Sequence, residues 1–184
     1  MKLKFMLVPL AILGLSVVGC SDEEKVAEKK KESVVNLKEE EVASKSTTNF
    51  NWITPKNKVC KANDGKIYKD DICEAKGMKA EDICRASGGR LPTIEELKEV
   101  VTDCGGINTT EMNKDFFSAM DKNKANKSYQ SCYKNKGFRS KVYWSSSAVK
   151  GYKDAVWVIR FSVGSVYRDY KLNNHYVLCV RDGQ

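Results

Sequence analysis

The most reactive side chains in this sequence are its seven cysteines. Cys20 directly follows an apolar N-terminal stretch, and the other six are spread along the chain: Cys60, Cys73, Cys84, Cys104, Cys132 and Cys179. An even number of cysteines in an exported protein is typical of a disulfide framework, although six cysteines allow many connectivities. Zinc is the alternative, but the sequence has no C-x-x-C pair and its single histidine is His175. We therefore expect disulfides, no metal and no cofactor.

The beginning of the chain has the pattern of an export signal. Lys2 and Lys4 precede an apolar stretch over 5–18, which is too short for a membrane span, because a span takes about 20 apolar residues. The sequence VVGC (17–20) resembles the lipobox of bacterial lipoproteins, whose cysteine is acylated and becomes the mature N-terminus. The resemblance implies a signal peptide over 1–19 and a membrane anchor through lipid on Cys20. An ordinary signal peptide with an incidental cysteine is the alternative.

The segment 20–49 is predicted to be a flexible tether behind this anchor. Lys, Glu, Ser and Val dominate it, and 22–46 contains no aromatic residue, Gly or Pro, so it buries too little to offset its ordering entropy. Ser21 rather than Asp follows the lipobox cysteine, which in diderm bacteria favours transport to the outer membrane. We expect a lipid-anchored protein of the bacterial cell envelope with a folded domain over 50–184. The net charge of +8 belongs to that domain.

Helices are predicted in the first half of the domain and strands in the second. One helix over 78–87 would end at the glycine pair 88–89. Another begins with the capping box TIEE (93–96) and continues to Cys104. The alternating apolar pattern predicts strands over 142–145, 155–161, 165–170 and 176–181. Helices followed by antiparallel strands indicate an α+β domain.

Short motifs over 78–182 resemble one known family in their order and spacing. They are GGRLPT (88–93), YWSSS (143–147), AxWxIxFxxG (155–164) and VxCVR (177–181). Together they resemble the Lcl C-terminal domain, a module at the end of bacterial collagen-like adhesins and other surface proteins. The resemblance implies a C-type lectin-like fold with two helices and an antiparallel sheet. It also implies three disulfides: Cys84–Cys179 between the first helix and the last strand, Cys104–Cys132 across the central loop, and Cys60–Cys73 at an N-terminal hairpin.

The sequence departs from the sugar-binding C-type lectins at their calcium motifs. Those lectins use Glu-Pro-Asn or Gln-Pro-Asp in a long loop and Trp-Asn-Asp on a strand. None of these tripeptides occurs here. Calcium-dependent sugar binding is therefore not expected.

The region 114–141, expected to be a long loop, is the first candidate ligand site. Basic residues with interleaved aromatic residues dominate it, and the candidates are Lys122, Lys124, Lys127, Lys134, Lys136, Arg139 and Lys141. Such a patch concentrates anions and offers aromatic faces for stacking, which suits a sulfated or otherwise anionic glycan. Some adhesins of the resembled family bind sulfated glycosaminoglycans. The alternative is a solvated loop that only keeps the protein soluble.

The segment 165–176 is the second candidate ligand site. Its candidates are Tyr167, Arg168, Tyr170, His175 and Tyr176. Tyrosine and its polar neighbours give adaptable contacts at low entropic cost. The alternative is the polar face of a hairpin.

The favoured function is a non-catalytic binding or adhesion module for an anionic glycan or a surface protein. A structural or envelope-assembly lipoprotein without a soluble ligand is the second hypothesis. The third is an enzyme, because RLPT (90–93) before an acidic helix also resembles formylglycine-generating enzymes, which use reactive cysteines. A Ser-His-Asp site would need His175, which has no nucleophile-elbow motif near it. We therefore expect no enzymatic activity.

Overall fold

The structure is a computed structural model that describes residues 50–110 and 114–182. These residues belong to one unit, which spans 46–184. Cys20, the signal peptide over 1–19 and the tether over 20–49 lie outside the described residues and stay predictions. Within the described ranges, no helix is long and apolar enough to cross a membrane.

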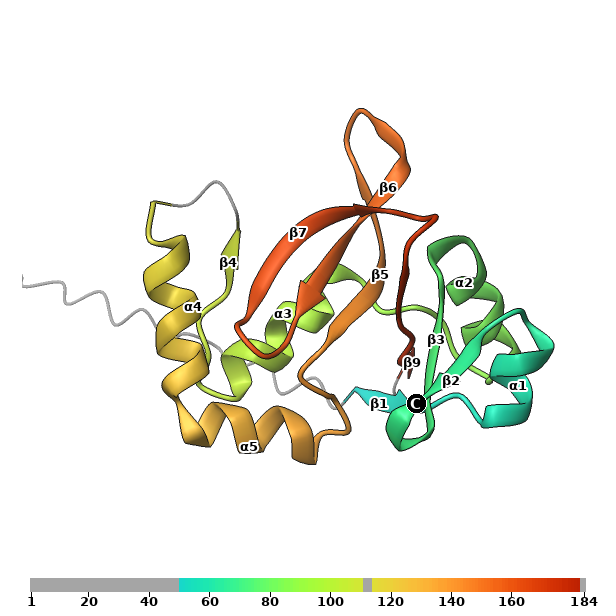
Figure 1. Ribbon diagram of the computed structural model, residues 1–184, viewed down its shortest axis with the longest axis horizontal. Helices are drawn as coiled ribbons and strands as arrows, with labels where there is room; N and C mark the ends of the chain where they lie inside the picture. The colour runs from blue at the N-terminus through green and yellow to red at the C-terminus, as the bar shows by residue number, and fades with distance from the viewer. Residues whose placement is uncertain (1–49, 111–113, 183–184) are drawn as a thin grey trace, which may run out of the picture. The chain divides into compact units, whose positions relative to one another are not determined.

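The described chain forms short helices and strands before it enters the long hairpins of the main sheet (Figure 1). The helices are α1 (Asn57–Ala62), α2 (Gly77–Ala86), α3 (Ile94–Asp103), α4 (Phe116–Ala125) and α5 (Lys127–Asn135), with a 3₁₀ turn η1 (Lys69–Asp71). The strands are β1 (Asn51–Ile53), β2 (Lys66–Tyr68), β3 (Ile72–Lys76), β4 (Thr109–Thr110), β5 (Val142–Val149), β6 (Tyr152–Arg160), β7 (Ser165–Tyr170), β8 (Asn174–Tyr176) and β9 (Cys179–Arg181). The predicted α+β class is confirmed.

Seven strands form the main sheet in the order β2-β3-β8-β5-β6-β7-β4, and β1 pairs with β9 in a separate two-stranded sheet. Most pairs are antiparallel, while β4 with β7 and β5 with β8 are parallel. The short strand β8 lies between β3 and β5, where Tyr176 is opposite both Glu74 and Tyr143. It therefore brings the N-terminal hairpin beside the beginning of the long hairpin β5–β6.

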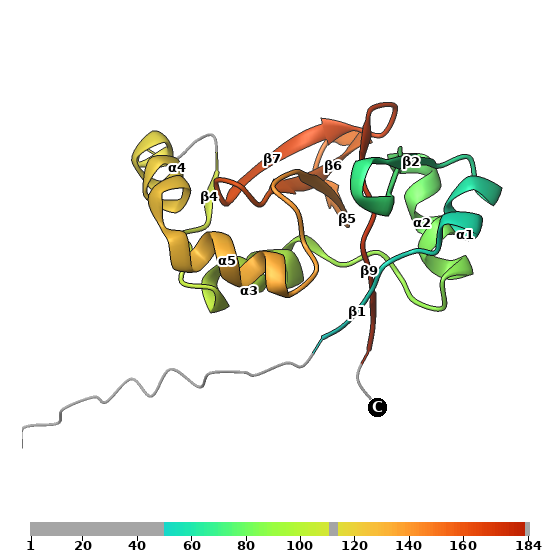
Figure 2. The same cartoon turned by 60° about the horizontal axis from the view of Figure 1, so that its bottom comes forward.

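The two predicted helices are present as α2 and α3. The capping box at the beginning of α3 is complete: Glu96 N donates to Thr93 Oγ1 over 3.2 Å, and Thr93 N donates to Glu96 Oε2 over 2.7 Å. Its apolar stripe, which includes Leu97 and Val101, is buried against the sheet. Figure 2 shows α3 and α5 together below strands β5, β6 and β7.

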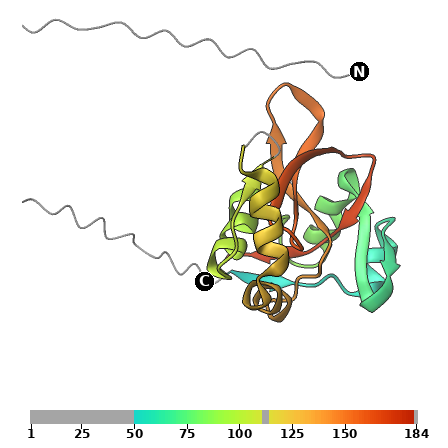
Figure 3. The same cartoon turned by 60° about the vertical axis from the view of Figure 1, so that its left-hand side comes forward.

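The prediction of a long loop over 114–141 was wrong, because α4 and α5 occupy most of this region. Asn126 caps α5, since its side chain accepts a hydrogen bond from Tyr129 N over 3.0 Å. Tyr129 and Tyr133 are four residues apart, and both are fully buried. The sequence prediction missed this helical spacing, because the frequent lysines of the region are typical of an exposed loop. Helix α4 lies at the edge of the sheet formed by β4, which Figure 3 shows from the side.

The predicted strand 176–181 is interrupted in the structure. Its first residue ends β8, which pairs with β3, whereas 179–181 form β9, which pairs with β1. The chain changes from one sheet to the other at 177–178. This change is a tertiary effect that local alternation cannot reveal.

Two apolar clusters and three disulfides hold the domain together. One cluster packs α3, α5 and the sheet around Phe138 and Phe161, and the other surrounds Trp144. The disulfides are Cys60–Cys73, Cys84–Cys179 and Cys104–Cys132, the same pairs that the family resemblance implies. The second spans 95 residues, so on the chain-entropy model it stabilises the fold by about 4 to 5 kcal/mol.

Candidate functional site

The candidate site is a groove on the face of the sheet near β8, and it consists of two adjoining hollows. The hollow that we name the basic hollow is lined by Tyr68, Lys69, Lys134, Arg139, Ser140, Lys141 and Tyr176. The hollow that we name the mixed hollow is lined by Tyr68, Glu74, Lys141, Val142, Asn174, His175 and Tyr176. Their volumes, about 400 and 180 Å³, suit single units of an extended ligand better than an enclosed cofactor.

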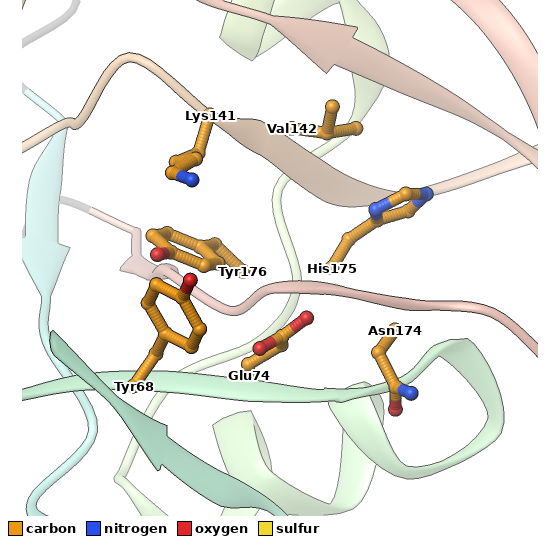
Figure 4. Close-up of a pocket in the computed structure, with 7 residues that line it drawn as sticks. All are labelled: Tyr68, Glu74, Lys141, Val142, Asn174, His175 and Tyr176. Atoms are coloured by element: carbon orange, nitrogen blue, oxygen red, sulfur yellow. The ribbon is translucent and has the colours of Figure 1, made fainter.

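Two tyrosines form the floor that both hollows share. The rings of Tyr68 and Tyr176 lie 6.0 Å apart and are tilted by 52°. Tyr176 is only 6% exposed and packs edge-on against Tyr143, with ring centres 5.7 Å apart, whereas Tyr68 is 45% exposed. Figure 4 shows Lys141 above this pair, and its Nζ lies 5.3 Å from the centre of the Tyr68 ring. The buried ring fixes the floor, and the exposed ring is available for stacking on a ligand.

The basic hollow carries positive charge that pairs with no acidic side chain among the described residues. Lys134, Arg139 and Lys141 make no ion pair with any acid among the described residues. The guanidinium of Arg139 donates to the carbonyl of Phe138 over 3.4 Å, and Lys134 Nζ lies 5.9 Å from the centre of the Tyr133 ring. Such a cluster raises the local concentration of anions.

His175 lines the mixed hollow and is held by its neighbours. Its Nε2 lies 2.6 Å from Asp169 Oδ2, and its ring centre lies 4.5 Å from that of Trp144. Burial raises the pKa of Asp169, but hydrogen bonds from His175, Tyr170 N and Asn173 outweigh it, so the pKa lies below the usual value. Asp169 therefore stays an anion at neutral pH and orients the imidazole.

The structure brings together five of the residues predicted from the two candidate regions. Lys134, Arg139 and Lys141 come from the first region, and His175 and Tyr176 come from the second. The sequence offered no sign that these two regions would meet, because the contact depends on the position of β8 next to β5.

The other predicted residues lie outside the groove. The exposed residues Lys122 and Lys124 are on α4, Lys127 begins α5 and Lys136 follows it. On β7, the Arg168 guanidinium carbon lies 4.2 Å from the centre of the Tyr152 ring. Tyr167 packs on the cluster around Trp144, and Tyr170 is exposed.

Ser140, Val142 and Asn174, which adjoin predicted residues, were not predicted to line the groove, and three more distant groove residues also escaped the sequence prediction: Tyr68, Lys69 and Glu74. They belong to the N-terminal hairpin β2–β3 and the turn η1 within it. An aromatic residue beside a lysine at 68–69 was the one available signal. It pointed to no particular partner, because residues more than 60 positions away complete the site.

The described residues offer little for catalysis or metal binding. Within them, no group of three or more His, Cys, Asp or Glu side chains is placed to hold a metal ion. All six cysteines of the domain are in disulfides, so none supplies the reactive thiol that a formylglycine-generating site uses. The seven residues that line the mixed hollow include His175 but no Ser, Thr or Cys.

The domain thus combines an α+β fold and three disulfides with an open groove that has a floor of two tyrosines. The model of the Lcl C-terminal domain family matches residues 28–181, and the chain belongs to this family. The match begins within the predicted tether and includes the N-terminal hairpin that contributes to the groove. The Lcl C-terminal domain family is not a family of enzymes. No curated protein and no solved structure shows a significant match to the chain.

Proposed function

We propose that this chain is a non-catalytic binding module of the bacterial cell envelope that holds an anionic glycan in the groove. The observation that carries the proposal is the convergence of Lys134, Arg139 and Lys141, without acidic partners among the described residues, above the tyrosine floor. Cations give long-range attraction to sulfate or carboxylate groups, and aromatic faces stack on sugar rings. Family membership supports an envelope or adhesion role.

The proposal includes the location of the domain. The lipobox VVGC (17–20) supports a lipid anchor on Cys20, and Ser21 supports the outer membrane. Behind such an anchor, the segment 20–49 would hold the groove at a distance on the order of 30 Å from the lipid headgroups. A module at that distance can contact a polymer without competition from the headgroups.

Retention of the full oxidised protein on heparin tests the proposal. We expect the variant Lys134→Ser/Arg139→Ser/Lys141→Ser to elute at much lower salt than the wild type. The matched control is Lys122→Ser/Lys124→Ser/Lys127→Ser, which removes the same charge from exposed positions outside the groove. It should elute close to the wild type. The slope of log affinity against log salt should become less steep by about 2 to 3 for the groove variant alone. The reason is that binding releases fewer counterions when it makes fewer contacts between cations and anions.

Two results would contradict the proposal. If the groove variant and its control lose heparin retention equally, the attraction is diffuse and depends on net charge rather than on a site. Failure of the wild type to bind both heparin and a non-sulfated acidic polysaccharide such as hyaluronan, even at low salt, would remove the anionic ligand.

A role in envelope assembly without a soluble ligand is the competing proposal, and a surface protein is the alternative ligand. The side chains of Tyr152, Tyr170 and Leu172 are all more than 40% exposed, which favours a protein contact outside the groove. Protease treatment of intact cells separates these roles. Loss of the domain supports an adhesive role at the surface, and full protection supports assembly inside the envelope.

A further inference from the structure

Glu74 places a negative charge at one end of the otherwise basic groove. It is a partly buried residue on β3, and Figure 4 shows its carboxylate between Tyr68 and Asn174, directed into the mixed hollow. In the described part of the chain, this carboxylate has neither an ion pair nor a hydrogen bond. Lys66 lies opposite Glu74 in the β2–β3 register but does not pair with it. The carboxylate is therefore available to a ligand.

The two hollows differ in polarity although they share a floor. The basic hollow has four cations, namely Lys69, Lys134, Arg139 and Lys141. The mixed hollow has Glu74, Asn174 and His175 among its hydrogen-bonding groups, and Lys141 is the cation that it shares with the basic hollow. A ligand that covers Tyr68 and Tyr176 thus contacts cations at one end and a carboxylate at the other.

We propose that the groove selects an acidic polysaccharide in which a negatively charged sugar alternates with a sugar that has no negative charge and offers hydroxyl or amide N–H donors. This inference rests on the proposed function and names the class of glycan. The charged unit occupies the basic hollow, and the uncharged unit donates hydrogen bonds to Glu74 in the mixed hollow. A polymer with sulfate on every unit is disfavoured, because one sulfate would lie beside Glu74.

The energetic basis is that an ionised carboxylate only accepts hydrogen bonds. Hydroxyl and amide donors bind it in charge-assisted hydrogen bonds, which are stronger than neutral ones. A sulfate at the same place meets a like charge at short range, and the partly buried position of Glu74 limits screening by salt. Glu74 therefore acts as a charge filter: it improves binding of one class of polymer and weakens binding of the other.

Paired titrations test this inference with full-length oxidised protein at pH 7.5. The first probe is a hyaluronan oligosaccharide, in which uronate and N-acetylhexosamine alternate and no sulfate is present. The second is dextran sulfate of similar length, which is charged along the whole chain. We expect Glu74→Gln to strengthen dextran sulfate binding about three- to tenfold and to weaken hyaluronan binding about threefold.

Glu81→Gln is the matched control. Glu81 is an exposed glutamate on α2 that lines a separate hollow together with Arg85 and Arg90. Removal of its charge changes the net charge by the same amount, so the ratio of the two affinities should stay at the wild-type value. Thermal unfolding of both variants shows whether the fold is intact.

The outcomes separate this inference from the proposed function. If both polymers bind the wild type and Glu74→Gln leaves their affinity ratio unchanged, the charge filter is wrong while the anionic-glycan site stands. The same conclusion follows if Glu81→Gln changes the ratio as much as Glu74→Gln does. If neither polymer binds the wild type, the proposed function fails and the inference fails with it.

Discussion

Two groups of basic side chains in this domain differ in their surroundings. Around α2 and α3 they are paired with acids: Arg90 with Glu96 and Asp182, Arg85 with Asp82, Lys79 with Asp64, and Lys98 with Glu95. In the groove, Lys134, Arg139 and Lys141 have no acidic partner among the described residues. Both groups belong to one small domain, so composition does not explain the difference. The paired group includes contacts that contribute to the fold, whereas the charge of the groove group is not neutralised by an acid among the described residues.

Arg90 is the clearest member of the paired group. Its guanidinium donates to both carboxylate oxygens of Glu96, over 2.9 and 2.6 Å, and to Asp182 near the C-terminus. Glu96 is also the capping-box residue of α3. These contacts raise the pKa of Arg90 and, with the hydrogen bonds from Thr93, lower the pKa of Glu96 although burial opposes the shift. The network therefore connects the beginning of α3 with the end of the chain.

The largest effect that we predict is a loss of stability in Glu96→Ala. This change removes the capping box and leaves Arg90 without its least exposed partner, so the free energy of unfolding should fall by about 2 kcal/mol. Glu95→Ala is the control, because the Glu95 side chain is 74% exposed and pairs with Lys98 at the surface; its effect should be below about 0.5 kcal/mol. Urea unfolding measures both variants. Heparin retention of Glu96→Ala should equal that of the wild type. A loss of retention would show that the ion-paired group also contributes to binding.

The pH dependence of stability provides the second prediction. The pKa of Glu96 is lower in the folded protein than in the unfolded chain, so its stabilising contribution is fully present above the unfolded pKa of about 4.3. It is lost as the pH falls through the folded pKa. Glu96→Gln removes the charge while it retains an amide oxygen at the cap, so we expect a deficit of about 1 kcal/mol at neutral pH. Unfolding curves at several pH values should show that this deficit shrinks as the pH falls below the unfolded pKa of about 4.3, and a constant deficit would contradict it.

The third prediction concerns the tyrosine floor. Tyr68→Ser should weaken glycan binding by about 1 kcal/mol, because it removes an exposed stacking surface and the partner of Lys141. Tyr170→Ser is the matched control, since Tyr170 is 58% exposed on β7 outside the groove. Titration with the same oligosaccharide compares the two variants. If both variants lose the same affinity, any exposed tyrosine of this domain contributes to glycan binding.

The α+β class and helices α2 and α3 follow from local signals, namely a capping box, glycine ends and alternating apolar residues. Helix α5 was missed because six of its nine residues, Lys127, Ser128, Gln130, Ser131, Lys134 and Asn135, are polar and exposed or partly exposed. Its buried face consists of two tyrosines, and their role becomes visible only when Tyr129 is seen to donate to the Phe161 carbonyl.

The groove could be predicted only in fragments. Charge density pointed to Lys134, Arg139 and Lys141, and turn composition pointed to His175 and Tyr176. The sequence did not show that these fragments meet, because Tyr176 reaches the groove through pairing of β8 with both β3 and β5. Long-range strand pairing has no local signature in a single sequence. The same limit explains why Glu74 escaped notice.

The smallest effect that we predict is on the stability of the groove variant Lys134→Ser/Arg139→Ser/Lys141→Ser. These side chains have no acidic partner to lose among the described residues, and their removal relieves repulsion between like charges. The free energy of unfolding should therefore stay within about 0.5 kcal/mol of the wild type or rise slightly. Urea unfolding of this variant alongside Glu96→Ala makes the comparison direct. A loss above about 1 kcal/mol would mean that the groove cations stabilise the fold, and the low heparin retention expected for this variant would then no longer identify a binding site.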